Sequence, residues 1–356
     1  MFLMSLSPER QAAFALCAFK AGIPVIFCSF SKVVVAAPRE SCDVEGFFRN
    51  YGKVGVSLLL SAERIGFHSG SSNNQSVRLS LKVVEELRLG LELLIRLAET
   101  IPASEEEELL VVLAKMAELL PEVLVSTLEF QERTDMLNFA FSNGLQVMDL
   151  DAISRGLVQQ HITRVSEAKI RIRENVDSYM VCYRSILKEH YAIIIGDPLS
   201  SKEPLVRVHS SCYTGDLLGS LSCDCRDQLH DTVKKIAEDP AGGIILYLSQ
   251  EGRGIGLPNK IRAYNLQEDK GLDTVEANLC LGFKDDERDF RVVRLILKDL
   301  GVQKVRLITN NPEKIRQLSS AGVDVASRVP ILMRSNPYNH KYLQTKSEKL
   351  GHIFIA

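Results

Sequence analysis

Three closely spaced cysteines constrain this chain more than any other feature of its sequence. Cys212, Cys223 and Cys225 follow the spacing C-x10-C-x-C, and thiols clustered in this way predict a metal site in a reducing compartment rather than disulfides. Three thiolates leave one position of a tetrahedral zinc ion open, as catalytic zinc sites require, so that it can hold a water of lowered pKa. A closed structural site completed by His209 or His230 is the alternative on spacing alone.

The bulk composition is that of a soluble globular protein with a sizeable core. Hydrophobic residues make up 46% of the 356 residues and charged residues 25%, and a chain of this length predicts about two domains. The formal net charge of -2 gives no general attraction to nucleic acid or membranes, so we expect neither as a partner. Any anionic ligand must therefore be held by local basic groups.

The sequence gives no sign of export or membrane insertion. Glu9 and Arg10 interrupt the apolar run that a secretory signal requires, and apolar runs such as Ile244–Leu248 are too short to cross a bilayer. We therefore expect a cytoplasmic protein, or a plastid protein if the source is a plant. Free, mostly buried thiols are expected at the remaining cysteines, which are Cys17, Cys28, Cys42, Cys182 and Cys280.

Hydrophobic patterns in the first half predict both strands and helices. Apolar runs predict a hairpin over residues 23–37 and a strand over residues 54–60. Apolar residues recur at helical spacing over residues 81–100 and 104–120. The polar residues 66–76, rich in glycine, serine and asparagine, predict a loop.

The helix predicted over residues 104–120 has a clear start. Ser104 and Glu107 have the spacing of a capping box. We expect the acidic run at residues 105–108 to be a solvated first turn, where negative charge is favourable. An amphipathic stretch over residues 149–173 completes this half of the chain.

The second half alternates between predicted strands and helices. Gly301 ends a predicted helix over residues 290–300, and Asn311 followed by Pro312 predicts the start of the next helix. Strands are predicted over residues 181–185, 191–195, 205–209, 242–248 and 305–309. This alternation indicates an α/β (α+β) fold, with two domains over residues 1–165 and 166–356.

A glycine-rich stretch, residues 250–256 (QEGRGIG), directly follows the predicted strand that ends at Leu248. Its backbone N–H groups and Arg253 can contact a phosphate, although a plain turn into the next helix explains the same glycines. The cations that a polyphosphate needs are present without making the chain basic. They are Arg207, Lys260, Arg262, Arg288 and Lys314.

Asp286 and Arg288 lie two residues apart in the run DERD. On a strand or an extended loop they face the same way, so Asp286 can serve as an acid or base and Arg288 as a clamp on phosphoryl oxygens. A surface charge cluster at the start of a helix is the alternative.

Taken together, these motifs resemble the GTP cyclohydrolase II family. Over roughly residues 175–352 the chain matches that family in order at RVHS-C-TGD, CDC, QEGRGIGL-NKIRAY, DTVEAN-LGF, DERDF, LITNNP-K and NP-N--YL-TK--K-GH. Members of the family open the imidazole ring of GTP by hydrolysis, releasing formate and pyrophosphate and leaving a diamino-ribosylaminopyrimidinone phosphate. This reaction is the first step of riboflavin biosynthesis, and the family is usually homodimeric.

The resemblance implies a role for each matching residue. Asp286 corresponds to the assigned proton acceptor and Tyr264 to a tyrosine close to the chemistry. Arg288 corresponds to the assigned nucleophile, but a guanidinium stays protonated and has no free lone pair, so we expect a charge clamp. Magnesium is expected with the phosphates. The zinc ligands correspond to Cys212, Cys223 and Cys225. Contacts to GTP are implied for Arg207, Val208, His209, Ser210, Ser211, Gln228, Glu251, Gly252, Arg253, Thr274, Thr309 and Lys314.

Three positions depart from the pattern of the family. Ser211 stands where the family usually has Glu, Ser249 where it has Arg, and Arg226 where it has Gly. Loss of a carboxylate and an arginine near the substrate motivates an alternative function, a catalytically impaired nucleotide-binding or regulatory paralogue. Because the three thiols and the pair Asp286 and Arg288 are kept, we expect the ring-opening activity to be retained.

The first half resembles dihydroxybutanone phosphate synthase, to which this domain is fused in many bacteria and in plants. The resemblance lies mostly at apolar positions of residues 12–37, 54–67 and 111–150. The acidic segment of that family is reduced to residues 29–32, and its metal-binding histidine segment is replaced by residues 102–108, which contain no histidine. We therefore expect this domain to have lost synthase activity and to serve in dimerisation or regulation.

Overall fold

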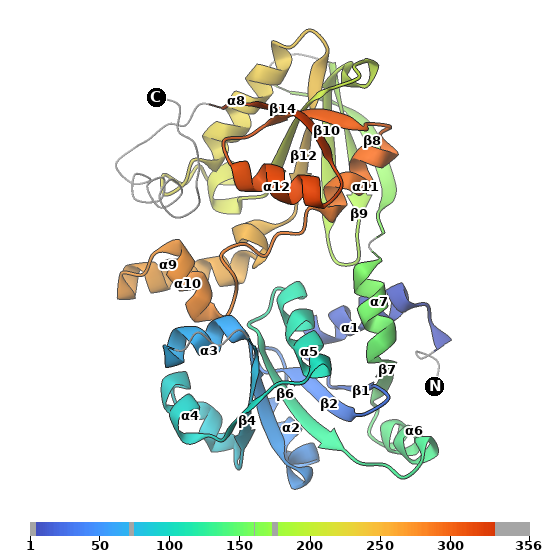
Figure 1. The fold of residues 1–356 in the computed structure, drawn as a ribbon, viewed down its shortest axis with the longest axis vertical. Coiled ribbons are helices and arrows are strands. Elements are labelled where there is room, and N and C mark those ends of the chain that lie inside the picture. The colour runs from blue at the N-terminus through green and yellow to red at the C-terminus, as the bar shows by residue number, and fades with distance from the viewer. Residues whose placement is uncertain (1–4, 71–74, 160, 173–176, 332–356) are drawn as a thin grey trace. The chain divides into compact units, whose positions relative to one another are not determined.

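The computed structural model describes residues 5–70, 75–159, 161–172 and 177–331, which form two compact units. Unit 1 contains residues 1–159 and 258–287, and unit 2 contains residues 160–257 and 288–356. These units do not coincide with the predicted division at residue 165. Residues 258–287 belong to the second half of the sequence but pack within unit 1, where Figure 1 shows them as α9 and α10.

The described part of unit 1 is built on one seven-stranded sheet. The predicted hairpin is confirmed as β1 (Val25–Cys28) and β2 (Val33–Pro38), and the strand predicted over residues 54–60 is confirmed as β3 (Val56–Leu60). Neighbouring strands are antiparallel except for β1 and β7, which are parallel. In sheet order the strands are β5 (Thr100–Pro102), β4 (Val77–Leu81), β3, β6 (Glu122–Leu128), β2, β1 and β7 (Gln146–Asp149).

Helices bury the apolar side chains of this sheet. The capping box of α5 is confirmed, because Ser104 and Glu107 each accept a hydrogen bond from the backbone of the other. None of the helices in the described part of the chain is both long enough and apolar enough to cross a membrane. The helices of unit 1 are α1 (Pro8–Lys20), α2 (Val44–Tyr51), α3 (Ala62–Ser69), α4 (Leu91–Leu97), α5 (Glu105–Met116), α6 (Arg133–Ser142), α7 (Leu150–Val158), α9 (Leu257–Lys270) and α10 (Thr274–Leu281).

Three predicted segments of the first half are wrong in part. The helix predicted over residues 81–100 is divided into the end of β4, a 3-10 turn and α4. Leu81 belongs to β4, which pairs with β3 and buries alternate residues. The loop predicted over residues 66–76 begins inside α3, and residues 71–74 lie outside the described residues. The amphipathic stretch over residues 149–173 divides into α7 and a strand, β8 (Thr163–Arg171).

The first turn of α5 is not the solvated turn that its acidic run predicts. Glu107 is only 2% exposed. Its carboxylate lies 2.5 Å from Lys32 Nζ and 3.1 Å from Arg78 Nη1, so two cations from the sheet neutralise it. Glu108 accepts hydrogen bonds from the backbone and the hydroxyl of Ser76, both at 2.7 Å. The acidic turn therefore anchors α5 to the sheet.

Unit 2 also contains a seven-stranded sheet among its described residues. Four adjacent strands are parallel, β14, β13, β11 and β12, and the remaining pairs, from β12 across to β8, are antiparallel. The five strands predicted here are confirmed as β9 to β13. In sheet order the strands are β14 (Asp324–Val329), β13 (Lys304–Ile308), β11 (Leu205–Ser210), β12 (Gly242–Leu248), β10 (Glu189–Gly196), β9 (Asp177–Arg184) and β8.

Helices cover both faces of this sheet. Alternate residues of the buried strands point to opposite faces. Val206 and Ile244 share one hydrophobic cluster with residues of α11 (Arg291–Asp299) and α12 (Pro312–Ser320), whereas Leu205 and Ile245 share another with Ile236 of α8 (Cys225–Ala237) (Figure 1). The helix predicted over residues 290–300 is therefore confirmed as α11.

The topology predicts where unit 2 binds a ligand. The chain runs from β11 to β12 on one side of β11 and then crosses to β13 on the other side. In open α/β sheets ligands bind at the carboxyl ends of the strands, at the point where the strand order reverses. That point lies between the ends of β11 and β13, at Ser210 and Ile308.

Candidate active site

The three cysteines of the sequence motif lie together at the carboxyl end of β11. Cys212 follows the strand, and Cys225 is the first residue of α8. Their ligand atoms and that of Cys223 all lie within 4.8 Å of one another, and the sulfurs of Cys212 and Cys223 are 3.8 Å apart. Among the described residues, no His, Asp or Glu completes this group. Neither His209 nor His230 therefore supplies a fourth ligand.

The donor set suits zinc. Three soft sulfur ligands are typical of zinc sites, and a missing fourth protein ligand leaves one coordination position for water or substrate. Hydrogen bonding to Cys212 and Cys223, together with burial, raises the pKa of the Cys225 thiol well above its usual value. Three thiolates this close together require a cation to offset their repulsion.

Gly215 is a residue of this cluster that the sequence reasoning did not single out. A Cβ atom at this position would lie 2.8 Å from the sulfur of Cys223 and 3.0 Å from that of Cys212. The chain between the first two ligands passes so close to the sulfurs that only glycine fits. The motif TGD, which lies between Cys212 and Cys223, is the signal that could have identified it.

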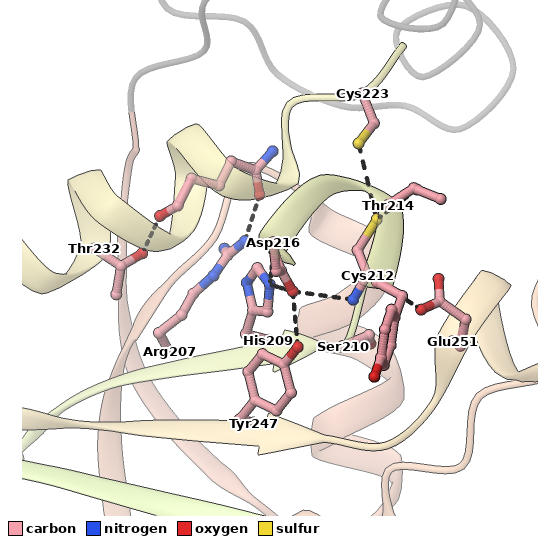
Figure 2. A network of polar contacts seen from close by, with 12 residues as sticks. Arg207, His209, Ser210, Cys212, Thr214, Asp216, Cys223, Thr232, Tyr247 and Glu251 are labelled. Carbon is pink, nitrogen blue, oxygen red and sulfur yellow. Dashed lines mark hydrogen bonds and ion pairs between the residues drawn. The ribbon is translucent and has the colours of Figure 1, made fainter. Parts of the chain in front are cut away.

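Asp216, the last residue of that motif, is the centre of a buried hydrogen-bond network (Figure 2). Its carboxylate accepts hydrogen bonds from the backbone N–H of Cys212 at 3.0 Å and from the hydroxyl of Tyr247 at 2.9 Å. It also lies 3.1 Å from Nε2 of His209. The His209 ring stacks on Tyr247 with 5.5 Å between centroids. Burial lowers the pKa of His209, whereas the adjacent Asp216 raises it in part.

Arg207 is a cation buried at the same strand end. It is 5% exposed, and its guanidinium donates to the Ile308 carbonyl at 3.0 Å and to Gln228 Oε1 at 2.5 Å. Gln228 in turn donates to Asp224 at 2.6 Å. Burial lowers the pKa of Arg207 to about 10, so the group stays charged at neutral pH. Among the residues that the structure describes, its Nε has no hydrogen-bond partner, which is unusual for a buried donor.

Two further cations lie beside the aromatic ring of Phe290. The guanidinium of Arg288 is 5.2 Å from the ring centroid, and Nζ of Lys314 is 5.9 Å from it. Lys314 is 7% exposed and donates to the Val208 carbonyl at 3.1 Å, whereas Arg288 lies 3.5 Å from the hydroxyl of Ser210. Together with Arg207, these side chains place three cations near the end of β11. Such a cluster favours a polyanionic ligand.

Thr309 lies at the end of β13 and supports the start of α12. Its hydroxyl accepts a hydrogen bond from the backbone of Asn311 at 3.1 Å. The side chain of Asn311 caps the helix by accepting from the backbone of Glu313 at 2.9 Å. The predicted N-cap at Asn311 and first turn at Pro312 are therefore confirmed.

The glycine-rich loop forms a left-handed turn. Gly252 and Arg253 both have φ near +61°, and for a non-glycine residue such as Arg253 this conformation is uncommon and typical of functional sites. The N–H groups of Gly254 and Gly256 donate to the carbonyls of Gln250 and Glu251. These two N–H groups are used within the loop itself, and contact of Gly252 and Arg253 with a phosphate stays a prediction.

Glu251 connects this loop to the zinc-ligand loop. Its carboxylate accepts a hydrogen bond from the backbone N–H of Tyr213 at 2.6 Å (Figure 2). The side chain is 8% exposed. Glu251 therefore positions the residue that follows Cys212, in addition to any contact with substrate.

The two serines that depart from the family pattern make backbone contacts. The Ser249 hydroxyl donates to the Glu189 carbonyl, and its N–H donates to Nδ1 of His190 at 3.3 Å. The Ser211 N–H donates to the Leu248 carbonyl at 2.8 Å, which extends the pairing of β11 with β12. Ser249 is thus held by β10, and it supplies no charge to the cationic cluster.

Several predicted site residues lie in unit 1. Tyr264 is in α9, Thr274 is the first residue of α10, and Asp286 lies in the extended chain before Arg288. Arg262 pairs there with Glu40 at 2.6 Å, so it is not part of the cationic cluster. The implied roles of Tyr264, Thr274 and Asp286 stay predictions. The matched motif over residues 336–352 lies outside the described residues.

Comparisons with known proteins identify relatives of the second half of the chain. The family model for GTP cyclohydrolase II matches residues 163–330. A relative from Haemophilus influenzae (strain PittEE), GTP cyclohydrolase-2, is 54% identical over 169 residues, which cover 47% of this chain and 77% of the relative. Riboflavin biosynthesis protein RibBA from Synechocystis is 52% identical over 180 residues, which cover 49% of this chain and 32% of the relative.

One solved structure spans both halves. It is RibBX from A. baumannii, described as a two-domain 3,4-dihydroxy-2-butanone 4-phosphate synthase, and the alignment covers 89% of this chain and 99% of that one. The TM-score of 0.31 and the sequence identity of 16% are too low to relate the first half of the chain to it. The match to GTP cyclohydrolase-2, which extends over 77% of that relative at 54% identity, shows that this chain belongs to the GTP cyclohydrolase II family.

Proposed function

We propose that this chain is a zinc-dependent hydrolase that opens the imidazole ring of GTP, releases formate and pyrophosphate, and so begins riboflavin biosynthesis. The single observation that carries the proposal is the arrangement at the end of β11. The cluster of three thiols and the cationic cluster of Arg207, Arg288 and Lys314 lie at the same strand end. A metal held by these thiols would lie beside three cations that can bind a polyanion, and this supports hydrolysis of a nucleoside triphosphate.

The cationic residues would bind the triphosphate. Arg207 is held in place by Ile308 and Gln228, so its guanidinium is oriented before the ligand arrives, and a preorganised cation binds a phosphate with less loss of side-chain entropy. Arg288 would act as a clamp on the charge that develops at phosphorus. Magnesium would share the phosphate oxygens. Zinc held by the three thiolates would supply Lewis-acid chemistry for hydrolysis at the purine ring.

The departures from the family pattern favour a second candidate, a nucleotide-binding or regulatory paralogue without turnover. Ser249 replaces an arginine of the family and is held by Glu189 and His190 rather than directed to a ligand. Because the three thiols lie together and Arg207 and Lys314 lie at the same strand end, we favour retained catalysis and expect only weaker GTP binding.

The decisive experiment measures formate released from GTP and Mg²⁺ by the purified chain, with and without a zinc chelator. We expect chelator-sensitive formate release from the wild-type chain. Cys223→Ser should lose it by a factor of at least about 100, because one of the three ligands is removed. Cys182→Ser is the matched control, since Cys182 lies in β9 and outside the thiol group.

Either negative result is informative. If zinc-loaded wild-type protein binds GTP but releases no formate, the paralogue without turnover replaces the enzyme. If Cys223→Ser releases formate like Cys182→Ser, the thiol cluster is not the catalytic metal site.

For unit 1 we propose a non-catalytic role, together with a homodimeric state and a cytoplasmic location for the chain. The carboxylate of Glu107, where the synthase family is expected to bind metal, is neutralised by Lys32 and Arg78. These ion pairs favour a structural role for the acidic turn of α5 over a role in binding metal. Incubation with ribulose 5-phosphate and Mg²⁺ should yield no dihydroxybutanone phosphate, and light scattering should give the mass of a dimer.

A further inference from the structure

We propose that Asp216 is a positioning residue for the metal site. Its carboxylate holds the backbone of Cys212 so that the three thiols can bind zinc. The inference rests on the proposed zinc-dependent function and deepens it. Asp216 does not belong to the thiol group itself. It acts on Cys212 through the backbone.

Asp216 closes the turn that carries the first zinc ligand. Its own N–H donates to the Cys212 carbonyl at 2.6 Å, and its carboxylate accepts from the Cys212 N–H at 3.0 Å. Both polar groups of the Cys212 backbone are therefore tied to one residue. Rotation of the backbone at Cys212 would move its sulfur, so these two hydrogen bonds restrict where that sulfur lies.

The same carboxylate anchors the turn to the sheet. His209 projects from β11 and Tyr247 from β12, and both contact Asp216, at 3.1 Å and 2.9 Å respectively (Figure 2). The side chain of Asp216 is only 9% exposed. A buried carboxylate is stable only when its oxygens accept several hydrogen bonds, and here three different groups supply them.

The turn between Cys212 and Asp216 must also be held in place because its backbone passes close to the thiol cluster. A Cβ atom added at Gly215 would lie within 3.0 Å of the sulfurs of Cys212 and Cys223. A small displacement of the turn would press the backbone into the thiol cluster or open it. Residues that orient metal ligands from outside the ligand group commonly change metal affinity by about 10- to 100-fold when they are replaced.

The test is the zinc affinity of Asp216→Asn, measured by competition with a chromophoric chelator. Asparagine keeps the size of the side chain but presents an N–H₂ group to donors that need an acceptor. We expect zinc affinity to fall by about 10- to 100-fold. Asp216→Glu keeps the carboxylate and should recover part of that loss. Asp227→Asn is the matched control, since it removes the same charge from an exposed residue of α8.

A second readout follows the geometry of the site rather than its affinity. Co²⁺ bound by three thiolates gives a visible absorption spectrum that depends on coordination geometry. We expect this spectrum to change in Asp216→Asn and to match the wild type in Asp227→Asn. Circular dichroism at each zinc concentration shows whether the compared proteins are folded. Tyr247→Phe removes one donor to Asp216 and is a milder variant, for which we expect a smaller loss of zinc affinity.

The outcomes separate this inference from the proposed function. If the wild-type chain binds zinc and folded Asp216→Asn binds it equally well with an unchanged Co²⁺ spectrum, the positioning role is wrong while the zinc enzyme stands. If the wild-type chain binds no zinc, both are wrong. Reduced affinity with a changed spectrum supports the positioning role, whether or not formate is released.

Discussion

Buried charged side chains are concentrated at the carboxyl ends of β11 and β13. Arg207, Asp224 and Lys314 are between 1% and 7% exposed. Burial of charges in this way costs stability unless partners compensate for lost hydration. Within the described part of the chain, Arg207 retains a donor, Nε, without a hydrogen-bond partner. At the scale of single residues, this excess of donor capacity is what an anionic ligand would use.

His190 provides a residue-scale prediction about pH. Burial, with a smaller contribution from Lys188, lowers the pKa of His190 from 6.5 to about 4. Its Nδ1 accepts the Ser249 N–H, so a proton on Nδ1 would break that contact. The unfolded chain therefore binds a proton at higher pH than the folded chain. The stability due to the neutral ring is complete above about pH 6.5 and is lost as the pH falls toward about 4.

The expected loss at about pH 5 is about 2 kcal/mol. We would compare urea unfolding at about pH 7.5 and about pH 5 for the wild type and for His190→Gln, which cannot titrate. The variant should show a smaller decrease in unfolding free energy between the two pH values. Equal decreases would mean that folding does not change the pKa of His190.

At the scale of elements, the first turn of α5 shows how the sheet changes the environment of a helix end. Lys32 lies in the turn between β1 and β2, and Arg78 lies in β4, far from Glu107 in the sequence. Both cations reach Glu107, at 2.5 Å and 3.1 Å. An acidic run that favours its own helix start therefore also attaches that helix to the sheet.

Glu107→Gln should lower the free energy of unfolding by about 1–3 kcal/mol. This figure is below the usual cost of removing one partner from a buried ion pair, because Lys32 and Arg78 are 20% and 28% exposed at their side chains and can regain water. Urea unfolding measures the change. Glu105→Gln is the control, since Glu105 is exposed on the same turn, and its effect should stay within about 0.5 kcal/mol. Equal effects would show that the ion pairs contribute nothing.

At the scale of the whole molecule, residues 258–287 complete unit 1 although they follow most of unit 2 in the sequence. Ser61 donates to the Gly282 carbonyl at 2.7 Å and Arg64 to the Cys280 carbonyl at 2.9 Å. Lys115 pairs with Glu287 at 2.9 Å. The chain therefore passes between the two units more than once, and unit 1 cannot form its full set of contacts from the first half alone.

Residues 1–159 produced alone should accordingly be less stable than unit 1 in the full chain. The fragment lacks α9 and α10, so the surface of α3 that contacts α10 becomes exposed, and Arg64 and Lys115 lose partners. We expect faster cleavage by a protease after basic residues of α3 and α5 than in the full chain. The assignment of residues 258–287 to unit 1 would be contradicted if the fragment melted cooperatively and resisted the protease as well as the full chain does.

The sequence by itself was sufficient for the local features of the fold. The apolar runs of β9 to β13, the capping box at Ser104 and the start of α12 at Asn311 depend on neighbours a few residues away. All agree with the structure. The three thiols could be proposed as one group because their spacing alone carries the chemistry of a metal site. Family membership also followed from ordered motifs in the sequence.

The remaining features depend on contacts between segments that are distant in the sequence. The pairing of β4 with β3 replaced part of a predicted helix. Lys32 and Arg78 allow one carboxylate of the acidic turn, that of Glu107, to be buried. Asp216 became recognisable as a central residue only when β11 and β12 brought His209 and Tyr247 to it. Local patterns record which conformation a segment prefers, whereas burial and charge pairing are set by the neighbours that folding supplies, and no pattern within one segment contains that information.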